Sequence, residues 1–255
     1  MSRLKWPPAV ELKRVDSPVI DGSLGLLNSG KVEVLGLLPY SSNYTFLARL
    51  TEGERQTLAV YKPRRGERPL WDFPTGTLAQ REVGAWLVSE ATGWNLVPPT
   101  VLRTDAPMGA GSLQLFIDHD PERHYLVLME ERLESFQTFA ALDVIINNAD
   151  RKAGHVIEDA TGRLWAVDHG ITFHVEHKLR TVIWQFAGER LSPAVREGLE
   201  TVGARLADST ALGGELAALL SRPEAEATLA RVESLLVDDR FPAPAGDRPL
   251  PWPLV

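Results

Sequence analysis

The amino-acid sequence predicts a two-lobed α+β fold, in which a β-rich N-terminal lobe containing one helix precedes an α-rich C-terminal lobe. Three observations lead to this prediction. Short runs rich in Val, Leu and aromatic residues, separated by turn residues, occupy residues 31–118. Patterns with helical spacing dominate the chain after residue 119. The composition changes between Asp118 and Tyr125, where we expect the hinge between the lobes.

The composition of the chain restricts the class of protein. Its 255 residues include 27 Lys+Arg and 34 Asp+Glu, a formal net charge of -7, so tight binding to nucleic acid or to an anionic membrane is not expected. The sequence has no cysteine, which excludes disulfides, thiolate zinc sites and a cysteine nucleophile. Its apolar runs are far shorter than the roughly 20 residues of a membrane span, and its N-terminus lacks the apolar core of a signal peptide. We therefore expect a cytoplasmic protein without an integral membrane segment.

The N-terminal lobe is expected to follow an extension of residues 1–30. Its strands are predicted at residues 31–38, 44–50, 58–62, 97–103 and 112–118. One helix interrupts them over residues 77–92, between a capping sequence at residues 75–77 and a helix-ending glycine at position 93. The predicted order is therefore β-β-β-α-β-β.

The C-terminal lobe is predicted to occupy residues 119–239. In order, it should contain a helix at residues 131–146, a hairpin of strands at residues 156–157 and 164–167, and a helical region that ends near Val237. Ser192-Pro193 is typical of an N-cap followed by proline at the first helical position. Residues 240–255 contain five prolines, so we expect an extended tail outside the core.

Two polar segments of the C-terminal lobe carry the candidate chemistry. The first, residues 147–155, lies between a helix and a strand, so its loop is held at both ends while Asp150 projects from it. The second, residues 165–170, places Asp168 at the end of a strand. Asp168 follows Asp150 by 18 residues, about the length of a β-hairpin, so a hairpin between them should return the chain and bring Asp168 beside Asp150. Two converging carboxylates favour phosphoryl transfer, in which one orients or deprotonates a hydroxyl and the other holds Mg²⁺ on nucleotide phosphates. Asn148 is expected to cap or hydrogen-bond the loop backbone, and a direct ligand role is the alternative.

The N-terminal lobe offers the cation that such chemistry needs. Lys62 closes an apolar strand, and Glu82 in the following helix is placed to pair with it. The turn between the first two strands contains Ser41, Ser42 and Asn43, whose backbone N–H groups and side chains can cover phosphates.

The order of these features resembles the protein-kinase-like fold, in the atypical branch of phosphatidylinositol 3- and 4-kinases and HipA-like kinases. Lipid kinases of that branch carry Asp-Arg-His-x-x-Asn-Ile followed by Asp-Phe-Gly. This chain reads Asp150-Arg151-Lys152-Ala153-Gly154-His155-Val156 and then Asp168-His169-Gly170. The resemblance extends over most of residues 30–240 and is greatest to an actinobacterial family of the branch.

The resemblance implies an ATP-dependent kinase that uses Mg²⁺ or Mn²⁺. Asp150 would be the catalytic aspartate, within a catalytic loop that includes Arg151 and Lys152. Asp168 would be the principal metal ligand. His155 stands where the branch has a metal-ligating asparagine, so we expect it to be the second ligand.

On the nucleotide side, the resemblance implies that Lys62 contacts the α- and β-phosphates and that Glu82 orients it. The acceptor would be an alcohol, either an inositol-type or other polyol hydroxyl or a protein Ser/Thr, and transfer of AMP is open as well.

Two alternatives to an active kinase remain open. One is a pseudokinase that binds nucleotide or a partner without turnover. The other is a metal-dependent hydrolase, because His155, His169, His174 and His177 fall within 23 residues. The sequence predicts no oligomeric state.

Overall fold

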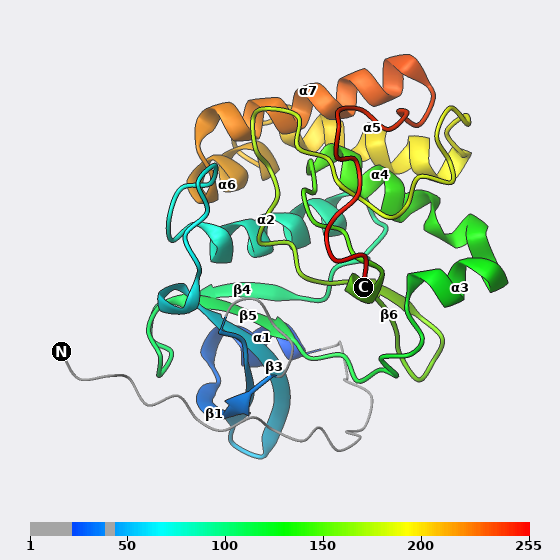
Figure 1. Cartoon of the computed structure of the whole chain (residues 1–255). Helices are drawn as coiled ribbons and strands as arrows, with labels where there is room; N and C mark the ends of the chain where they lie inside the picture. Colours follow the sequence, from blue (N-terminus) through cyan, green and yellow to red (C-terminus); the bar gives the residue numbers. More distant parts are fainter. Residues whose placement is uncertain (1–21, 39–43) are drawn as a thin grey trace. The chain divides into compact units, whose positions relative to one another are not determined.

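The computed structural model describes residues 22–38 and 44–255 (Figure 1). Its strands are β1 (Lys31–Leu37), β2 (Phe46–Glu52), β3 (Arg55–Pro63), β4 (Thr100–Arg103), β5 (Gly111–Leu115), β6 (Val156–Glu158) and β7 (Leu164–Ala166). Its α-helices are α1 (Ser23–Ser29), α2 (Leu78–Ala91), α3 (Tyr125–Arg132), α4 (Gln137–Ile145), α5 (Pro193–Ala207), α6 (Leu212–Leu219) and α7 (Arg222–Asp238). Short 3-10 helices are η1 (Arg64–Gly66), η2 (Leu133–Phe136) and η3 (Ala153–His155).

The chain divides into two compact units. The first consists of residues 1–83 and 98–118, and the second of residues 84–97 and 119–255. The first unit contains the β-sheet and the second contains most of the helices. The predicted α+β fold class, with a β-rich N-terminal region and an α-rich C-terminal region, is therefore confirmed.

The described part of the first unit contains a five-stranded antiparallel sheet in the order β1-β2-β3-β5-β4. Strand β3 pairs with both β2 and β5, and its side chains alternate between the two faces of the sheet. Tyr61 and Pro63 are buried, whereas Lys62 between them is half-buried and faces the opposite side. The pleat of β3 thus separates Lys62 from its apolar neighbours.

Two elements of the first unit differ from the predictions. β4 begins at Thr100 rather than at residue 97, because Pro98 and Pro99 have no N–H for the ladder. Helix α1 lies within the predicted N-terminal extension. Its C-terminal carbonyls accept hydrogen bonds from Arg103 Nη1, at 2.9 Å from Leu27 O and 3.2 Å from Gly30 O. A partner distant in sequence therefore stabilises this short helix.

The predicted helix at residues 131–146 is divided in the second unit. Helix α3 begins earlier, at Tyr125, and a 3-10 turn separates it from α4. Phe136 in that turn packs edge-on against Tyr125 and Phe139, with ring centroids 5.0 and 5.4 Å apart. These three rings belong to the hydrophobic core of the unit.

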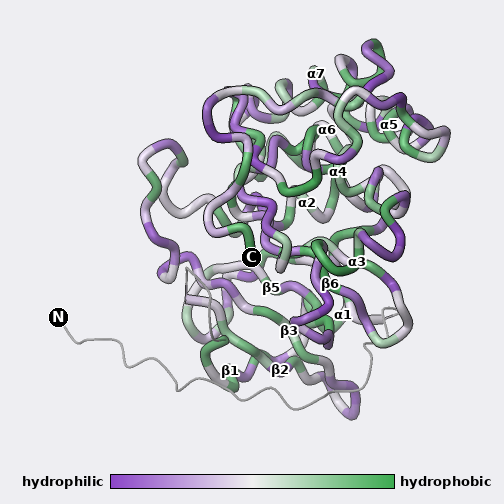
Figure 2. Tube along the Cα trace, turned by 45° about the vertical axis from the view of Figure 1, so that its right-hand side comes forward, coloured by the Kyte–Doolittle hydropathy of each residue, from purple (hydrophilic) through white to green (hydrophobic). Residues whose placement is uncertain are grey.

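Helix α5 begins as the sequence predicts. Its N-cap is Ser192, whose Oγ accepts a hydrogen bond from the Val195 N–H at 3.4 Å, and Pro193 is its first residue. Figure 2 shows hydrophilic and hydrophobic residues interspersed along α5 and α7. Within the described residues, every helix is too short or too polar to cross a lipid bilayer.

Most of residues 242–255 are exposed, as expected for a tail outside the core, but Phe241 departs from this prediction. Phe241 is 4% exposed and belongs to the core of the second unit, where its ring lies 5.6 Å from that of Phe186. Its N–H donates to Glu189 O and its carbonyl accepts from the Gly188 N–H. The tail is thus extended but docked, because an aromatic residue precedes its prolines.

Candidate active-site residues

The first unit contains an ion pair between strand β3 and helix α2. Lys62 Nζ donates a hydrogen bond to Glu82 Oε1. The Glu82 side chain is 3% exposed and the Lys62 side chain 21%, so the carboxylate is buried while the ammonium is near the surface. Because a buried carboxylate is costly without a cation, the pair fixes the position of the Lys62 ammonium. The predicted pairing of Lys62 with Glu82 is confirmed.

The other residues predicted to bind nucleotide are Ser41, Ser42 and Asn43. They lie outside the described residues, so their role stays a prediction.

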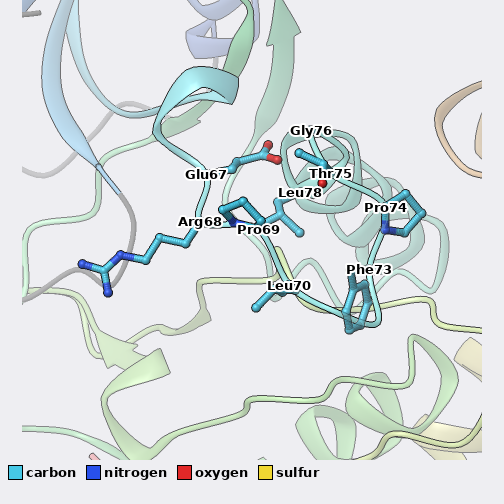
Figure 3. A pocket seen from close by; sticks show the side chains of 9 residues that line it. All are labelled: Glu67, Arg68, Pro69, Leu70, Phe73, Pro74, Thr75, Gly76 and Leu78. Atoms are coloured by element: carbon cyan, nitrogen blue, oxygen red, sulfur yellow. The ribbon is translucent and has the colours of Figure 1, made fainter. Parts of the chain in front are cut away.

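Helix α2 begins beside a narrow crevice in the first unit (Figure 3). It is lined by Glu67, Arg68, Pro69, Leu70, Phe73, Pro74, Thr75, Gly76 and Leu78. The Glu67 carboxylate points toward the start of the helix and accepts a hydrogen bond from the Ala79 N–H at 3.2 Å. Burial raises the pKa of Glu67, and the hydrogen bonds from the helix backbone act in the opposite direction.

The start of α2 differs from the predicted cap at residues 75–77. The Thr77 hydroxyl donates to Pro74 O at 2.7 Å and accepts from Arg81 Nε at 3.3 Å. The helix N–H is bound instead by Glu67 from the preceding loop. A carboxylate is favourable there because the first N–H groups of a helix lack partners and carry partial positive charge.

In the second unit, the segment between α4 and β6 carries Asp150. Asn147 has a φ of 51°, which turns the chain out of α4. The Asn148 side chain then holds the next turn, because its Oδ1 accepts from the Asp150 N–H at 3.0 Å. Its Nδ2 donates to Asp143 Oδ1 at 2.9 Å. The prediction that Asn148 hydrogen-bonds the loop backbone is confirmed.

Arg151 joins the two polar segments from inside the protein. Its side chain is fully buried, and its Nε donates to Asp143 Oδ1 at 3.0 Å. Nη1 donates to the carbonyls of His155 and Val167, at 3.2 and 3.0 Å. Nη2 lies 2.7 Å from His169 Nε2. One guanidinium therefore fixes the Asp150 loop and the segment of Asp168 relative to each other.

Asp143 is the buried counter-ion of Arg151. Its carboxylate also accepts hydrogen bonds from Asn148 and from the Thr181 hydroxyl, the latter at 2.9 Å. Burial raises the pKa of Asp143, whereas the Arg151 guanidinium and the two hydrogen bonds act in the opposite direction. The loop is thus built on a fully hydrogen-bonded carboxylate.

Asp150 and Asp168 influence each other electrostatically. Burial raises the pKa of Asp150, the Lys152 ammonium 3.1 Å away opposes this effect, and the negative charge of Asp168 raises the pKa further. The β6–β7 hairpin accounts for this proximity, since Val156 pairs with Ala166 just before Asp168. The expected return of Asp168 toward Asp150 is therefore supported by the structure.

Asp168 is half-exposed and sits in an uncommon backbone conformation. Its side chain is 49% exposed, and its φ is 59°, a value that non-glycine residues rarely adopt outside turns and functional sites. His155 Nε2 lies 3.4 Å from Asp168 Oδ2, while His155 Nδ1 faces the Lys152 N–H at 3.4 Å. The Nδ1 atom of His155 therefore faces the loop backbone, and its Nε2 atom faces the Asp168 carboxylate.

The histidines do not gather into a metal cluster. Within residues 22–38 and 44–255, no three His, Asp or Glu side chains are arranged to hold a metal ion together. His169 instead contacts Arg151, and His174 Nδ1 accepts a hydrogen bond from the Glu176 N–H at 3.0 Å. The arrangement gives no support to a hydrolase built on a cluster of protein ligands.

Sequence reasoning missed the residues that support the loop. Asn147 donates to the carbonyls of His174 and Glu176, at 2.8 and 2.6 Å, and accepts from the Lys178 N–H at 2.9 Å. Asp143 could have been found, because a carboxylate inside the apolar helix α4 requires a buried partner.

Comparison with protein-family models gives no match. The sequence is 41% identical over 272 residues to the protein Rv2133c of Mycobacterium tuberculosis, covering 91% of this chain and 95% of that protein. It is 28% identical over 151 residues to phosphatidylinositol 4-kinase gamma 4 of Oryza sativa subsp. japonica, which covers 52% of this chain and 27% of the rice protein.

The fold is similar to that of a solved kinase. The crystal structure of the Helicobacter pylori proinflammatory kinase CtkA matches 84% of this chain and 94% of its own, with a TM-score of 0.53 and 11% sequence identity. The two-unit architecture described above is thus kinase-like.

Proposed function

Because the chain belongs to the family of Mycobacterium tuberculosis Rv2133c and has a kinase-like fold, we propose that it is an ATP-dependent phosphotransferase acting on an alcohol. The observation that carries the proposal is the pair of aspartates, Asp150 and Asp168, on two segments joined by the buried Arg151. The partial likeness to the rice phosphatidylinositol 4-kinase supports the same reaction class.

In this proposal Lys62 binds the α- and β-phosphates of ATP. Glu82 holds the ammonium in place through the buried ion pair. An ammonium has three donor hydrogens, so the bond to Glu82 is compatible with further bonds to phosphate oxygens. Ser41, Ser42 and Asn43 are proposed to cover the phosphates.

The donor set fits Mg²⁺ or Mn²⁺ bound together with a nucleotide. Mg²⁺ usually takes one or two carboxylates, substrate phosphates and several waters, so it does not require three protein ligands in one cluster. Asp168 supplies a half-exposed carboxylate, and His155 lies beside it. When bound, the metal would neutralise charge on the phosphates. Asp168 is the proposed principal ligand and His155 the proposed second one.

Asp150 is the proposed catalytic aspartate. Its carboxylate would accept or orient the hydrogen of the attacking hydroxyl, and its raised pKa brings it closer to the range of an effective base. Lys152 lies 3.1 Å from this carboxylate and balances its charge. Arg151, which the sequence placed among the catalytic residues, is fully buried, so we assign it a positioning role.

The acceptor is proposed to be an inositol-type or other polyol hydroxyl, or a protein Ser/Thr. ATP labelled at the γ- or the α-phosphate, incubated with the protein, Mg²⁺ and a metabolite extract, tests this choice. We expect the γ-label to move, and its destination identifies the acceptor: a labelled small molecule would indicate a polyol, whereas labelled protein would indicate Ser/Thr. Movement of the α-label would replace phosphate transfer by AMP transfer. If neither label moves under any condition with Mg²⁺ or Mn²⁺, the proposed enzyme activity is wrong.

Two variants separate the roles of the aspartates. Asp150→Asn should keep the affinity for ATP and lower turnover by about 10²–10⁴, the usual contribution of a positioned acid–base group. Asp168→Asn should weaken metal-dependent nucleotide binding itself. Calorimetry with ATP and Mg²⁺ measures the binding, and equal losses in both variants would show that the two roles are misassigned.

A nucleotide-binding pseudokinase is the second candidate. It is favoured by His155, whose Nε2 faces Asp168 at the position where the related lipid kinases carry an asparagine. A pseudokinase would bind ATP without moving either label. The same labelling experiment, run beside the calorimetry, therefore distinguishes the two candidates.

A further inference from the structure

The C-terminal tail contacts the loop that carries Asp150. The Ala153 N–H donates a hydrogen bond to Leu254 O at 2.7 Å, and the position of a Cβ at Gly154 lies 4.0 Å from Val255 Cγ1. Ala153 and Gly154 stand between Asp150 and His155 in the loop. Figure 1 shows the tail, in red, crossing the helical unit and ending beside β6, which follows this loop.

A second contact joins the tail to the support of the loop. Pro249 O accepts hydrogen bonds from the Thr181 N–H and from Trp184 Nε1, both at 3.1 Å. The Thr181 hydroxyl binds the buried Asp143, the counter-ion of Arg151. Residues 249–254 therefore hold the loop directly through Ala153 and indirectly through Thr181.

The composition of this segment favours docking. Pro251 is buried, whereas Trp252 next to it is 88% exposed, so one face of the segment packs on the protein and the other meets solvent. Prolines at positions 249, 251 and 253 restrict the free chain, which lowers the conformational entropy lost when the segment binds.

We propose that residues 249–254 form a strap that positions the Asp150 loop for phosphoryl transfer, an inference that rests on the proposed function. Arg151 anchors the loop through its side chain, and the strap anchors its backbone at Ala153. A base that is misplaced by about 1 Å loses on the order of 10²-fold in rate, so a loop of this kind gains from two independent anchors.

The first test measures hydrogen exchange in the full-length chain. Pro251→Gly removes the buried proline and increases the freedom of the undocked strap. We expect faster exchange of the Asp150, Arg151 and His155 amides, whose own acceptors are outside the strap. Amides in the middle of α5 and α7 should keep their protection. The matched control is Pro244→Gly, at an exposed proline of the same tail, which should leave the loop unchanged.

A second variant covers the case in which Pro251→Gly fails to fold. Trp184→Phe keeps an aromatic ring but removes the Nε1 donor to Pro249 O. It should raise the exchange rate of the loop amides in the same direction and by less. Unchanged loop exchange in every folded variant with an altered strap contact would overturn the proposal.

The second test measures the reaction. Loosening the loop should lower kcat by about tenfold while the KM for ATP stays near its original value, because the substitution displaces Asp150 and leaves Lys62 and its ion pair with Glu82 unchanged. A faster variant would mean that the strap covers the site instead of positioning it, which also overturns the proposal. Exchange is measured without nucleotide, so a failure of the proposed function, seen as no label transfer by the unaltered chain, remains distinguishable from a failure of the strap.

Discussion

Arg151 shows how much of the candidate site depends on a single side chain. Its guanidinium binds a carboxylate, two carbonyls and an imidazole while having no exposed surface. Lysine cannot reproduce this set of contacts, since its single ammonium lacks the planar fork of five donors. The relative placement of Asp150 and Asp168 therefore depends on a residue that substrate does not reach.

We expect Arg151→Ala to lower the free energy of unfolding by about 3–5 kcal/mol, because it leaves the buried Asp143 without its cation. Arg151→Lys should restore only part of the loss. Urea denaturation measures both. Arg49→Ala, which breaks the exposed pair of Arg49 with Glu33, is the control and should change stability little. A loss at Arg151 no larger than in this control would contradict the prediction.

The pH dependence of the reaction should report on Asp150. A base must be deprotonated, and the pKa of Asp150 is raised by burial, so the rate should fall on acidification at a pH above about 3.9, the ordinary value for aspartate. Lys152→Met removes the ammonium that opposes this rise, and the acid limb should move to higher pH. Rates measured from pH 4 to 8 test the shift. Lys178→Met, which alters a lysine paired with Glu176 at 3.5 Å, should leave the limb in place.

At the scale of elements, helix α5 illustrates how packing overrides helix propensity. Gly198 stands inside α5, a position where glycine is unfavourable by about 1 kcal/mol relative to alanine. A Cβ at this residue would lie 2.2 Å from Trp94 Nε1 and 2.5 Å from Trp94 Cε2. The indole ring of Trp94 therefore occupies the space that a side chain at position 198 would need.

Gly198→Ala should therefore destabilise the protein despite its better helix propensity. Overpacking costs about 1–3 kcal/mol, which exceeds the gain from alanine. Gly203→Ala in the same helix is the matched control, because its Cβ would lie 3.3 Å from Val232 Cγ1, a contact that is relieved if this side chain moves by a few tenths of an ångström. Thermal unfolding of the two variants should give a lower Tm for the first alone. A stabilised Gly198→Ala variant would show that Trp94 moves aside without cost.

The elements predicted correctly from the sequence are those whose ends are marked by capping or turn residues nearby in the chain. The Ser192-Pro193 start of α5 and the β6–β7 hairpin follow from capping residues and turn residues close in sequence. The division between α3 and α4 does not. It accompanies the packing of Phe136 against Tyr125 and Phe139, which residue spacing alone does not reveal.

At the scale of the whole molecule, a ligand that binds only the folded chain stabilises all of it. We expect ATP with Mg²⁺ to raise the Tm, with a stabilisation of about 2.7 kcal/mol when the nucleotide is at 100 times its Kd. Lys62→Ala should reduce the shift, whereas Lys31→Ala, at the exposed start of β1, should not. Calorimetry at increasing nucleotide concentration measures the effect. Zinc with a phosphoester should do no better, and no shift with Mg²⁺ or Mn²⁺ would contradict nucleotide binding.

The residues of the candidate site could be predicted from the sequence where they belong to recognisable motifs. Lys62 and Glu82 were expected to pair from their places at a strand end and in the next helix, and they do. The anchoring of the Asp150 loop was not predictable, because Thr181 lies 38 residues from Asp143 and no local pattern connects the two. The docked tail was missed for the same reason, since prolines indicate an extended chain but not what the chain contacts.

The burial of the Asp143–Arg151 pair also limits how the family can diverge. Losing either partner leaves a charge in the interior, so a change at one position is tolerated only if the other changes with it. Positions 143 and 151 should therefore behave as one inherited unit among related sequences, keeping the ion pair or replacing both partners together.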